Sequence, residues 1–314
     1  MFALVTGGAG FIGSNLVDAL LAAGWSVRVL DDLSTGRSSD VPEAAEMLTG
    51  DVSDADAVRK AVDGVDVVFH QAALRAVLRS VEDPLSTDHV NTHGTLTVLK
   101  SAADAGVRRV IYASSSSVYG GSSTLPTPES APLMPRSPYA VSKLSGEHYC
   151  RVFWELTGLE TVALRYFNVY GPRQRPDSQY AAVIPLFIDA LRRGQPPMVH
   201  GDGRQTRDFT FITDVVACNI LAATAPASAC AGKAYNVAGG KPWSLLELIE
   251  LLAEAMGVDP PVARHGPPRA GDVRHTAADV AAAISDLGHR AKVPFPEGLR
   301  RTVEWFIGAG PNGR

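Results

Sequence analysis

The chain has 314 residues, of which 46% are hydrophobic and 20% are charged, and its 29 Lys and Arg against 33 Asp and Glu give a formal net charge of −4. This composition is typical of a globular protein with one large or two closely coupled domains, and it excludes a disordered chain. A mildly acidic chain without basic runs offers no surface that suits nucleic acid or an anionic membrane.

Short β-branched runs alternate with helical segments in the first half of the chain. The predicted strands are residues 2–6, 26–31, 65–70, 109–114 and 161–167, and the predicted helices are 13–23, 54–62, 91–105 and 139–156. This alternation predicts βαβ units, and the nearly continuous apolar strands indicate that helices cover both sheet faces. We therefore expect an α/β fold with a doubly wound parallel sheet.

After Asn168 the chain becomes richer in proline and glycine, with predicted helices at 183–193, 244–256 and 297–307. The connections between the two halves are short and apolar, so we expect both to pack as one body around a cleft.

The uncharged segments and the cysteines indicate neither a membrane span nor a metal site. Residues 110–128 are serine-rich, and residues 215–232 contain Asn219 and Pro226, so neither segment suits a transmembrane helix. The chain starts in a strand pattern without a basic stretch or cleavage site, so we expect no secretory signal and a cytoplasmic location. We expect no metal, because the three cysteines are widely spaced and the eight histidines form no HExxH pair.

A glycine-rich turn at residues 7–13 follows the first strand and opens the first helix. Without Cβ atoms the backbone can approach a pyrophosphate, and the helix N-terminus offers N–H groups and a positive dipole end to that anion. Asp31 ends the second strand, where an acid binds the adenosine ribose, and Asp32 is the alternative acid. A carboxylate there repels a 2′-phosphate, so the pattern favours NAD over NADP.

Tyr139 and Lys143 stand four residues apart on one face of a predicted helix. The strand that starts at Arg109 ends in a serine run at the carboxyl edge of the sheet, where ligands bind in such folds. A phenol becomes a usable base near neutral pH when an ammonium and a cationic ring favour its phenolate, while a serine hydroxyl shares the substrate's proton. These residue types together predict a site that deprotonates a substrate hydroxyl.

The chain resembles the extended short-chain dehydrogenase/reductase family, and within it the nucleotide-sugar 4-epimerases. The matching motifs are TGGAGFIG (6–13), DDLSTG (31–36), GDV (50–52), HQAA (70–73), Asn91, VYG (118–120), SPY (137–139) with Lys143, and RYFN (165–168). The resemblance implies a Rossmann-type NAD-binding domain, residues 1–168 with 208–237 returning to it. It also implies a smaller α/β C-terminal substrate-binding domain, residues 169–207 and 238–314. Tightly bound NAD, a UDP-sugar substrate and a homodimer are implied as well.

The resemblance also assigns the site residues. The implied catalytic residues are Ser115, Tyr139 and Lys143. The implied cofactor contacts are Gly7, Gly10, Phe11, Ile12, Gly13, Asp31, Asp32, Ser34, Thr35, Gly36, Asp51, Val52, Gln71, Ala72, Ala73, Arg75, Asn91, Tyr139, Lys143 and Tyr166. The implied substrate contacts are Ser115, Ser116, Asn168, Arg175, Val183, Met198, Arg207, Arg269 and Thr276.

The expected reaction is 4-epimerisation of a UDP-hexose through a transient 4-keto sugar. Relatives that dehydrate or decarboxylate their substrates carry extra carboxylates where this chain has Ser116 and Ser117. Arg175 lies where relatives that act on UDP-glucuronate hold the sugar carboxylate, which favours UDP-glucuronate to UDP-galacturonate. A small residue at the gate position, Thr276, admits bulkier groups, so UDP-N-acetylglucosamine and UDP-glucose are alternatives. A ketoreductase and a non-catalytic NAD-binding sensor are hypotheses from two further functional classes.

Overall fold

The computed structural model describes residues 1–176, 181–268 and 273–308, and its centre is a parallel seven-stranded sheet. The strand order is β3-β2-β1-β4-β5-β6-β11, so the direction of winding reverses between β1 and β4. The predicted doubly wound class is therefore confirmed, and ligands of such sheets bind beyond the carboxyl ends of the strands. The strands are β1 (Phe2–Thr6), β2 (Ser26–Asp31), β3 (Glu46–Thr49), β4 (Val67–His70), β5 (Arg109–Ser115), β6 (Glu160–Tyr166) and β11 (Lys233–Val237).

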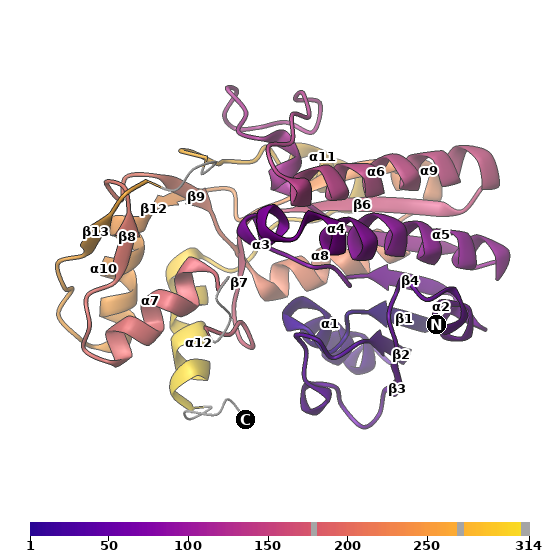
Figure 1. Ribbon diagram of the computed structural model, residues 1–314, viewed down its shortest axis with the longest axis horizontal. Helices are drawn as coiled ribbons and strands as arrows, with labels where there is room; N and C mark the ends of the chain where they lie inside the picture. The colour runs from indigo at the N-terminus through magenta and orange to yellow at the C-terminus, as the bar shows by residue number, and fades with distance from the viewer. Residues whose placement is uncertain (177–180, 269–272, 309–314) are drawn as a thin grey trace.

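Helices cover both faces of this sheet, as Figure 1 shows. On one face lie α2 (Ala55–Val62), α5 (Gly94–Asp104) and α6 (Pro138–Thr157), and on the other lie α1 (Phe11–Ala22) and α8 (Ile212–Thr224). Alternate residues of a strand point to opposite faces, so Leu4 packs in the cluster under the first group while Ala3 and Val5 pack in the cluster under the second. Burial of both faces explains the continuous apolar strands.

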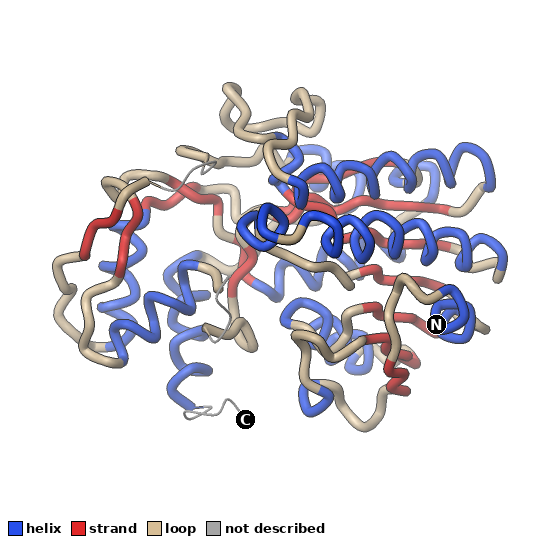
Figure 2. Tube along the Cα trace, viewed as in Figure 1, coloured by secondary structure: helices blue, strands red, loops and turns tan. Residues whose placement is uncertain are grey.

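A smaller part of the molecule lies at the left of Figures 1 and 2. It contains α7 (Val183–Arg192), α10 (Leu245–Met256) and α12 (Phe295–Gly308). Aromatic rings pack at its base, with the Tyr170 and Phe295 centroids 5.3 Å apart and those of Phe209 and Phe295 4.9 Å apart. These residues belong to the same apolar cluster as Val5, so the two parts share one core.

Short elements complete the chain. Three two-stranded sheets pair β7 (Val169–Tyr170) with β10 (Thr210–Phe211), β8 (Met198–His200) with β13 (Arg264–Gly266), and β9 (Thr206–Asp208) with β12 (Pro242–Ser244). The remaining helical segments are η1 (Ser38–Asp40), α3 (Val77–Glu82), α4 (Pro84–Asp88), the π-helical turn η2 (His89–His93), η3 (Ser116–Tyr119), α9 (Ala227–Cys230) and α11 (Ala281–Leu287).

The sequence did not predict most of the short elements, nor three longer ones, β3, β11 and α8, and each of these three has a physical reason. The edge strand β3 is short and only partly buried, so it lacks a continuous apolar run. Polar residues interrupt the apolar pattern of β11. Among them, Asn236 is fully buried, and hydrogen bonds satisfy its side chain. The helix α8 is buried on several sides, which removes the polar stripe that marks an amphipathic helix. Within the described ranges, no helix combines the length and the apolar character that a membrane crossing requires.

We predict that Gly146→Ala destabilises the protein, because a Cβ at residue 146 would lie 2.2 Å from the Tyr112 Oη atom of β5. Overpacking of this kind costs about 1–3 kcal/mol, which exceeds the gain of about 0.5–1 kcal/mol that alanine brings to a helix. Urea denaturation followed by circular dichroism measures the loss. Arg151→Ala, at an exposed position of the same helix, is the control and should change the unfolding free energy by less than about 0.5 kcal/mol. Equal stability of the Gly146→Ala variant would contradict this packing.

Candidate active site

A cleft of about 900 Å³ runs along the carboxyl edge of the sheet, from the glycine-rich turn to the smaller part of the molecule. Its lining includes all of the predicted cofactor contacts except Asn91, which is buried behind the wall. A second cavity of about 180 Å³ shares Asn168 and Arg207 with the cleft, and it contains Val183 and Met198. The structure thus brings most of the predicted residues to these two adjoining cavities.

The glycine-rich turn forms a cradle that only glycine can provide. Gly7 has a φ of +68°, and a Cβ at residue 13 would lie 2.1 Å from the carbonyl oxygen of Gly7. Gly10 caps the N-terminus of α1 and has no side chain that could occupy the first N–H groups of the helix. These groups can therefore face an anion such as a pyrophosphate.

Asp31 is buried at the end of β2 and lines the cleft beside this cradle. Its carboxylate accepts hydrogen bonds from the N–H groups of Ala9, at 2.9 Å, and Leu33, at 2.8 Å. Burial raises the pKa of Asp31, and these two hydrogen bonds oppose that shift. Asp32 is exposed and instead holds the N–H and hydroxyl groups of Ser34, at 2.9 and 2.7 Å. A fixed carboxylate beside a glycine cradle fits the adenosine half of a dinucleotide.

The cleft wall beside the glycine turn carries a polar triangle that the sequence predicted only in part. Gln71 Nε2 donates to Tyr166 Oη and to Asn219 Oδ1, both at 3.1 Å, and Asn219 Nδ2 donates to Tyr166 Oη at 2.8 Å. Asn219 was not predicted as a site residue. The sequence indicates it only through a single asparagine in the mostly uncharged segment that forms α8. A buried amide in such a helix requires polar partners, and here they lie at the cleft wall.

Asn91 contributes to the site indirectly, because its side chain is 1% exposed and does not line the cleft. Its Oδ1 atom accepts from Leu74 N at 2.8 Å, and its Nδ2 atom donates to Leu74 O at 3.0 Å and to Ser142 Oγ at 3.1 Å. These bonds hold Leu74 in place and so fix the start of the segment that contains Arg75 and Ala76. Ala76 has a φ of +92°. In this structure Asn91 therefore anchors the loop that carries Arg75.

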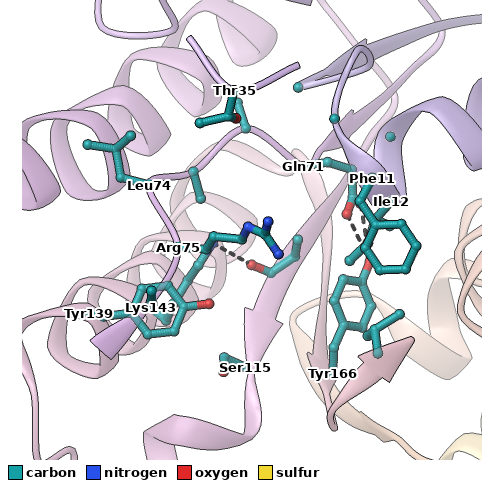
Figure 3. A pocket seen from close by; sticks show the side chains of 18 of the residues that line it. Phe11, Ile12, Thr35, Gln71, Leu74, Arg75, Ser115, Tyr139, Lys143 and Tyr166 are labelled. Carbon is teal, nitrogen blue, oxygen red and sulfur yellow. Dashed lines mark hydrogen bonds between the residues drawn. The ribbon is translucent and has the colours of Figure 1, made fainter. Parts of the chain in front are cut away.

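Ser115, Tyr139 and Lys143 meet at the centre of the cleft, as Figure 3 shows. Ser115 ends β5, and α6 begins with Ser137, whose hydroxyl accepts from Ala140 N at 3.1 Å. This cap places Tyr139 in the first turn and Lys143 one turn later. The Lys143 Nζ atom lies 6.0 Å from the centre of the Tyr139 ring and donates to the carbonyl of Ala113 at 2.8 Å.

Burial controls the protonation of these groups. It raises the pKa of Tyr139, although a hydrogen bond with Ser115 and the positive charge of Arg75 oppose the shift. It lowers the pKa of Lys143 to about 8, so most of the lysine is charged at neutral pH. Tyr139 therefore needs additional positive charge, such as that of a bound nicotinamide ring, before it can act as a base near neutral pH.

Arg175 lines the cleft but is bound to an acid on the cofactor side. Its Nη2 atom lies 2.7 Å from Asp40 Oδ2, and the two side chains are 16% and 18% exposed. The neighbouring Arg173 binds Asp18 of α1 in the same way, at 2.7 Å. These two ion pairs attach residues 171–175 to the cofactor side of the cleft. A sugar carboxylate that binds Arg175 would therefore have to compete with Asp40.

The remaining predicted contacts lie near the smaller part of the molecule. Ser116 lines the cleft, and so does Thr276, whose hydroxyl accepts from Asp208 N at 3.2 Å. Arg269 lies outside the described residues. The three cysteines are free and buried, and among the described residues no three His, Cys, Asp or Glu side chains are grouped to hold a metal ion.

The family model described as the NAD dependent epimerase/dehydratase family matches residues 3–238. A UDP-glucose 4-epimerase from Mycolicibacterium smegmatis is 41% identical over 313 residues, which cover 98% of this chain and 98% of the relative.

Solved structures are similar over nearly the whole chain. The Thermotoga maritima UDP-glucose 4-epimerase with UDP-glucose has a TM-score of 0.93 and 36% identity, and the match covers 98% of this chain and 99% of that one. A UDP-N-acetylglucosamine 4-epimerase from Methanobrevibacter ruminantium has a TM-score of 0.92 and 38% identity, with 98% of each chain covered. MoeE5 in complex with UDP-glucuronic acid and NAD has a TM-score of 0.88 and 37% identity, with 98% and 100% covered.

Proposed function

The chain belongs to the NAD-dependent epimerase/dehydratase family, and on that premise we propose that it inverts C4 of a UDP-hexose through a transient 4-keto sugar. One observation carries the proposal: Ser115, Tyr139 and Lys143 meet in the cleft that also holds the glycine cradle. The absence of a carboxylate at Ser116 and Ser117 favours epimerisation over dehydration, which requires a further acid or base at C5.

The cradle, Asp31 and the wall at Gln71 and Tyr166 are the residues that would hold NAD. When bound, NAD supplies a hydride acceptor and donor at C4 of the sugar, and it is regenerated in each turnover. The chain's own residues then have three tasks: to bind the nucleotide sugar, to move one proton, and to exclude water from the keto sugar.

Tyr139 is the proposed base, because it lines the cleft beside Ser115, which helps to lower the pKa of its phenol. It takes the proton of the 4-hydroxyl as the C4 hydrogen leaves, and it returns the proton after the hydride arrives on the opposite face. Ser115 shares the hydrogen bond to the substrate oxygen. Lys143 stabilises the phenolate by its charge, which the carbonyl of Ala113 holds beside the Tyr139 ring.

Three sugars are equally supported as the substrate. UDP-glucuronate is supported by Arg175 in the cleft lining and by the complex of MoeE5, but the Arg175–Asp40 ion pair must open before the guanidinium can meet a carboxylate. UDP-glucose and UDP-N-acetylglucosamine require no such change, and related epimerases are named for them. Thr276 is small enough to leave room for an acetamido group.

We further propose that the protein forms a homodimer through α3, α4 and α6, which lie side by side in Figure 1. Large apolar side chains are exposed along these helices, among them Val81 at 63%, Leu85 at 82% and Leu156 at 80%. Several exposed apolar side chains on neighbouring helices favour an interaction surface there. A second copy of the same helices would cover it with a matching apolar surface.

For the reaction, we predict that Tyr139→Phe lowers the rate of C4 inversion by about 10²-fold or more, because proton transfer at the 4-hydroxyl is lost. Proton NMR of the UDP-sugar measures the rate, and the NAD content of the purified protein should stay that of the wild type. Tyr149→Phe, elsewhere on α6, is the control and should keep its activity. Unchanged turnover in Tyr139→Phe would contradict the proposed base. NAD binding without turnover of any UDP-sugar would favour the sensor instead.

For the sugar, we predict that Asp40→Asn reveals whether Arg175 binds a uronate. If it does, opening the ion pair raises kcat/KM for UDP-glucuronate by about threefold or more relative to UDP-glucose, since such a pair is worth up to about 1 kcal/mol. Arg175→Met would then abolish the activity on UDP-glucuronate alone. Equal effects of both variants on all three UDP-sugars, measured by proton NMR, would rule out Arg175 as the uronate ligand.

For the assembly, we predict by light scattering a mass about twice the 33.2 kDa of the chain. Leu85→Glu should shift the protein to the monomer, because it places a charge in the proposed apolar contact. Val262→Glu is the control, since Val262 is 90% exposed but lies in the smaller part of the molecule. A wild-type monomer, or a dimer that survives Leu85→Glu and dissociates with Val262→Glu, would contradict this interface.

A further inference from the structure

A buried ion pair lies directly behind the catalytic residues. Glu147 follows Lys143 by one turn of α6, and its carboxylate binds Arg165 of β6 through two hydrogen bonds, Oε1 to Nε at 2.9 Å and Oε2 to Nη2 at 2.7 Å. The two side chains are 7% and 5% exposed. Neither residue lines the cleft, so the pair does not belong to the binding surface itself.

This pair joins the two elements that carry the catalytic groups. Ser114 Oγ donates to Glu147 Oε1 at 2.5 Å, and Ser114 directly precedes Ser115 at the end of β5. Glu147 is four residues after Lys143, a spacing that places both on one helix face. One carboxylate therefore ties the strand end to the helix at the place where Ser115 and Lys143 must stay in register.

The guanidinium of Arg165 also makes hydrogen bonds on the side that faces away from Glu147. Its Nη1 atom donates to Tyr119 Oη at 2.8 Å and to the carbonyl of Glu129 at 3.0 Å. Tyr119 Oη donates in turn to Asn236 Oδ1 of β11 at 2.7 Å. Ser114, Tyr119, Glu129 and Asn236 come from four separate segments, so this hydrogen-bond network fixes the position of the ion pair.

The Glu147 carboxylate acts on the same region as Lys143. Burial is the main cause that raises the pKa of the Cys150 thiol, Glu147 raises it further, and Lys143 lowers it. Glu147 also raises the pKa of Tyr112, whose ring lies 5.1 Å from the Lys143 Nζ atom. An unpaired carboxylate one helical turn from Lys143 would favour the protonated forms of nearby groups, and the cation of Arg165 opposes that effect.

The other titratable groups near Tyr139 and Lys143 are mostly neutral. Burial lowers the pKa of His70, on β4, to about 3. Tyr112 on β5 and Cys150 on α6 keep their protons because burial raises their pKa values. Arg75, in the loop after β4, adds a positive charge on the cleft side. Glu147 and Arg165 supply the opposed charges on the buried side.

We propose that Glu147 and Arg165 act as a charge-neutral positioning pair for the Tyr139–Lys143 pair, with the anion holding β5 to α6 and the cation cancelling its charge. The inference rests on the proposed roles of Tyr139 and Lys143, and it assigns neither Glu147 nor Arg165 a contact with the substrate. The inference predicts the direction of a pKa shift. Removing the cation and removing the anion shift the proton loss of the Tyr139–Lys143 pair in opposite directions.

We predict that Arg165→Met raises the pH of the acid limb of kcat/KM by about half a unit or more, because an uncancelled anion retains the proton. Glu147→Gln should lower it by a similar amount, because an uncancelled cation expels the proton. The double variant Glu147→Gln/Arg165→Met should return to within about 0.3 unit of the wild type, and Arg165→Lys should keep the wild-type profile. A purely structural role would lower the rates without opposite shifts.

A second readout does not depend on turnover. Tyrosinate absorbance of the NAD-loaded protein, taken as the difference from the matching Tyr139→Phe variant, should show the Tyr139 phenolate at higher pH in Arg165→Met and at lower pH in Glu147→Gln. Arg109→Met is the matched control, because Arg109 is 1% exposed and binds Glu160 at 2.6 Å at the other end of the same two strands. It should destabilise the fold and leave both pH profiles unchanged.

Shifts of the same sign in both single variants, or a shift in Arg109→Met, would overturn the inference. Failure of the proposed function looks different: the wild type would invert no UDP-sugar, while the absorbance shifts would still appear. If a single variant fails to fold, the double variant and Arg165→Lys still test the inference. A pH profile of kcat/KM that differs from the wild type by more than about half a unit, in either of these two variants, would also contradict charge balance.

Discussion

The packing of α6 against the carboxyl end of β5 is the constraint on which the site depends. Three contacts follow one another along this seam: the Lys143 Nζ atom binds the carbonyl of Ala113, Gly146 lies against Tyr112, and Glu147 accepts from Ser114. A glycine is required because the helix approaches the strand too closely for a Cβ. The seam sets the distance between the serine at the strand end and the phenol on the helix, and the chemistry depends on that distance.

Positively charged side chains line the cleft, although the chain as a whole carries a small negative net charge. Lys143, Arg75 and Arg207 are among them. Burial alone would leave the Tyr139 phenol protonated and lower the charge of Lys143. The positive charge of a bound dinucleotide therefore completes the base, which couples cofactor binding to the readiness of the site.

Local patterns in the sequence predict the sheet, its winding and the glycine cradle, because each depends on neighbouring residues. Contacts between distant segments cannot be read in this way. The pairing of Arg175 with Asp40 joins two loops far apart in the chain, and the role of Asn91 depends on the loop at Leu74. Asn219 lies in an apolar helix, and only the folded chain shows that it meets Gln71 and Tyr166.

In the proposed reaction, a hydride leaves C4 of the sugar and returns to the same carbon within one turnover. A UDP-sugar that carries deuterium at C4 tests it most directly, with the product analysed by NMR and mass spectrometry and the absorbance of NADH recorded. This reaction predicts that the deuterium stays at C4 of the inverted product while no NADH accumulates. Loss of the deuterium to solvent, or a net change in NADH that matches product formation, would contradict it.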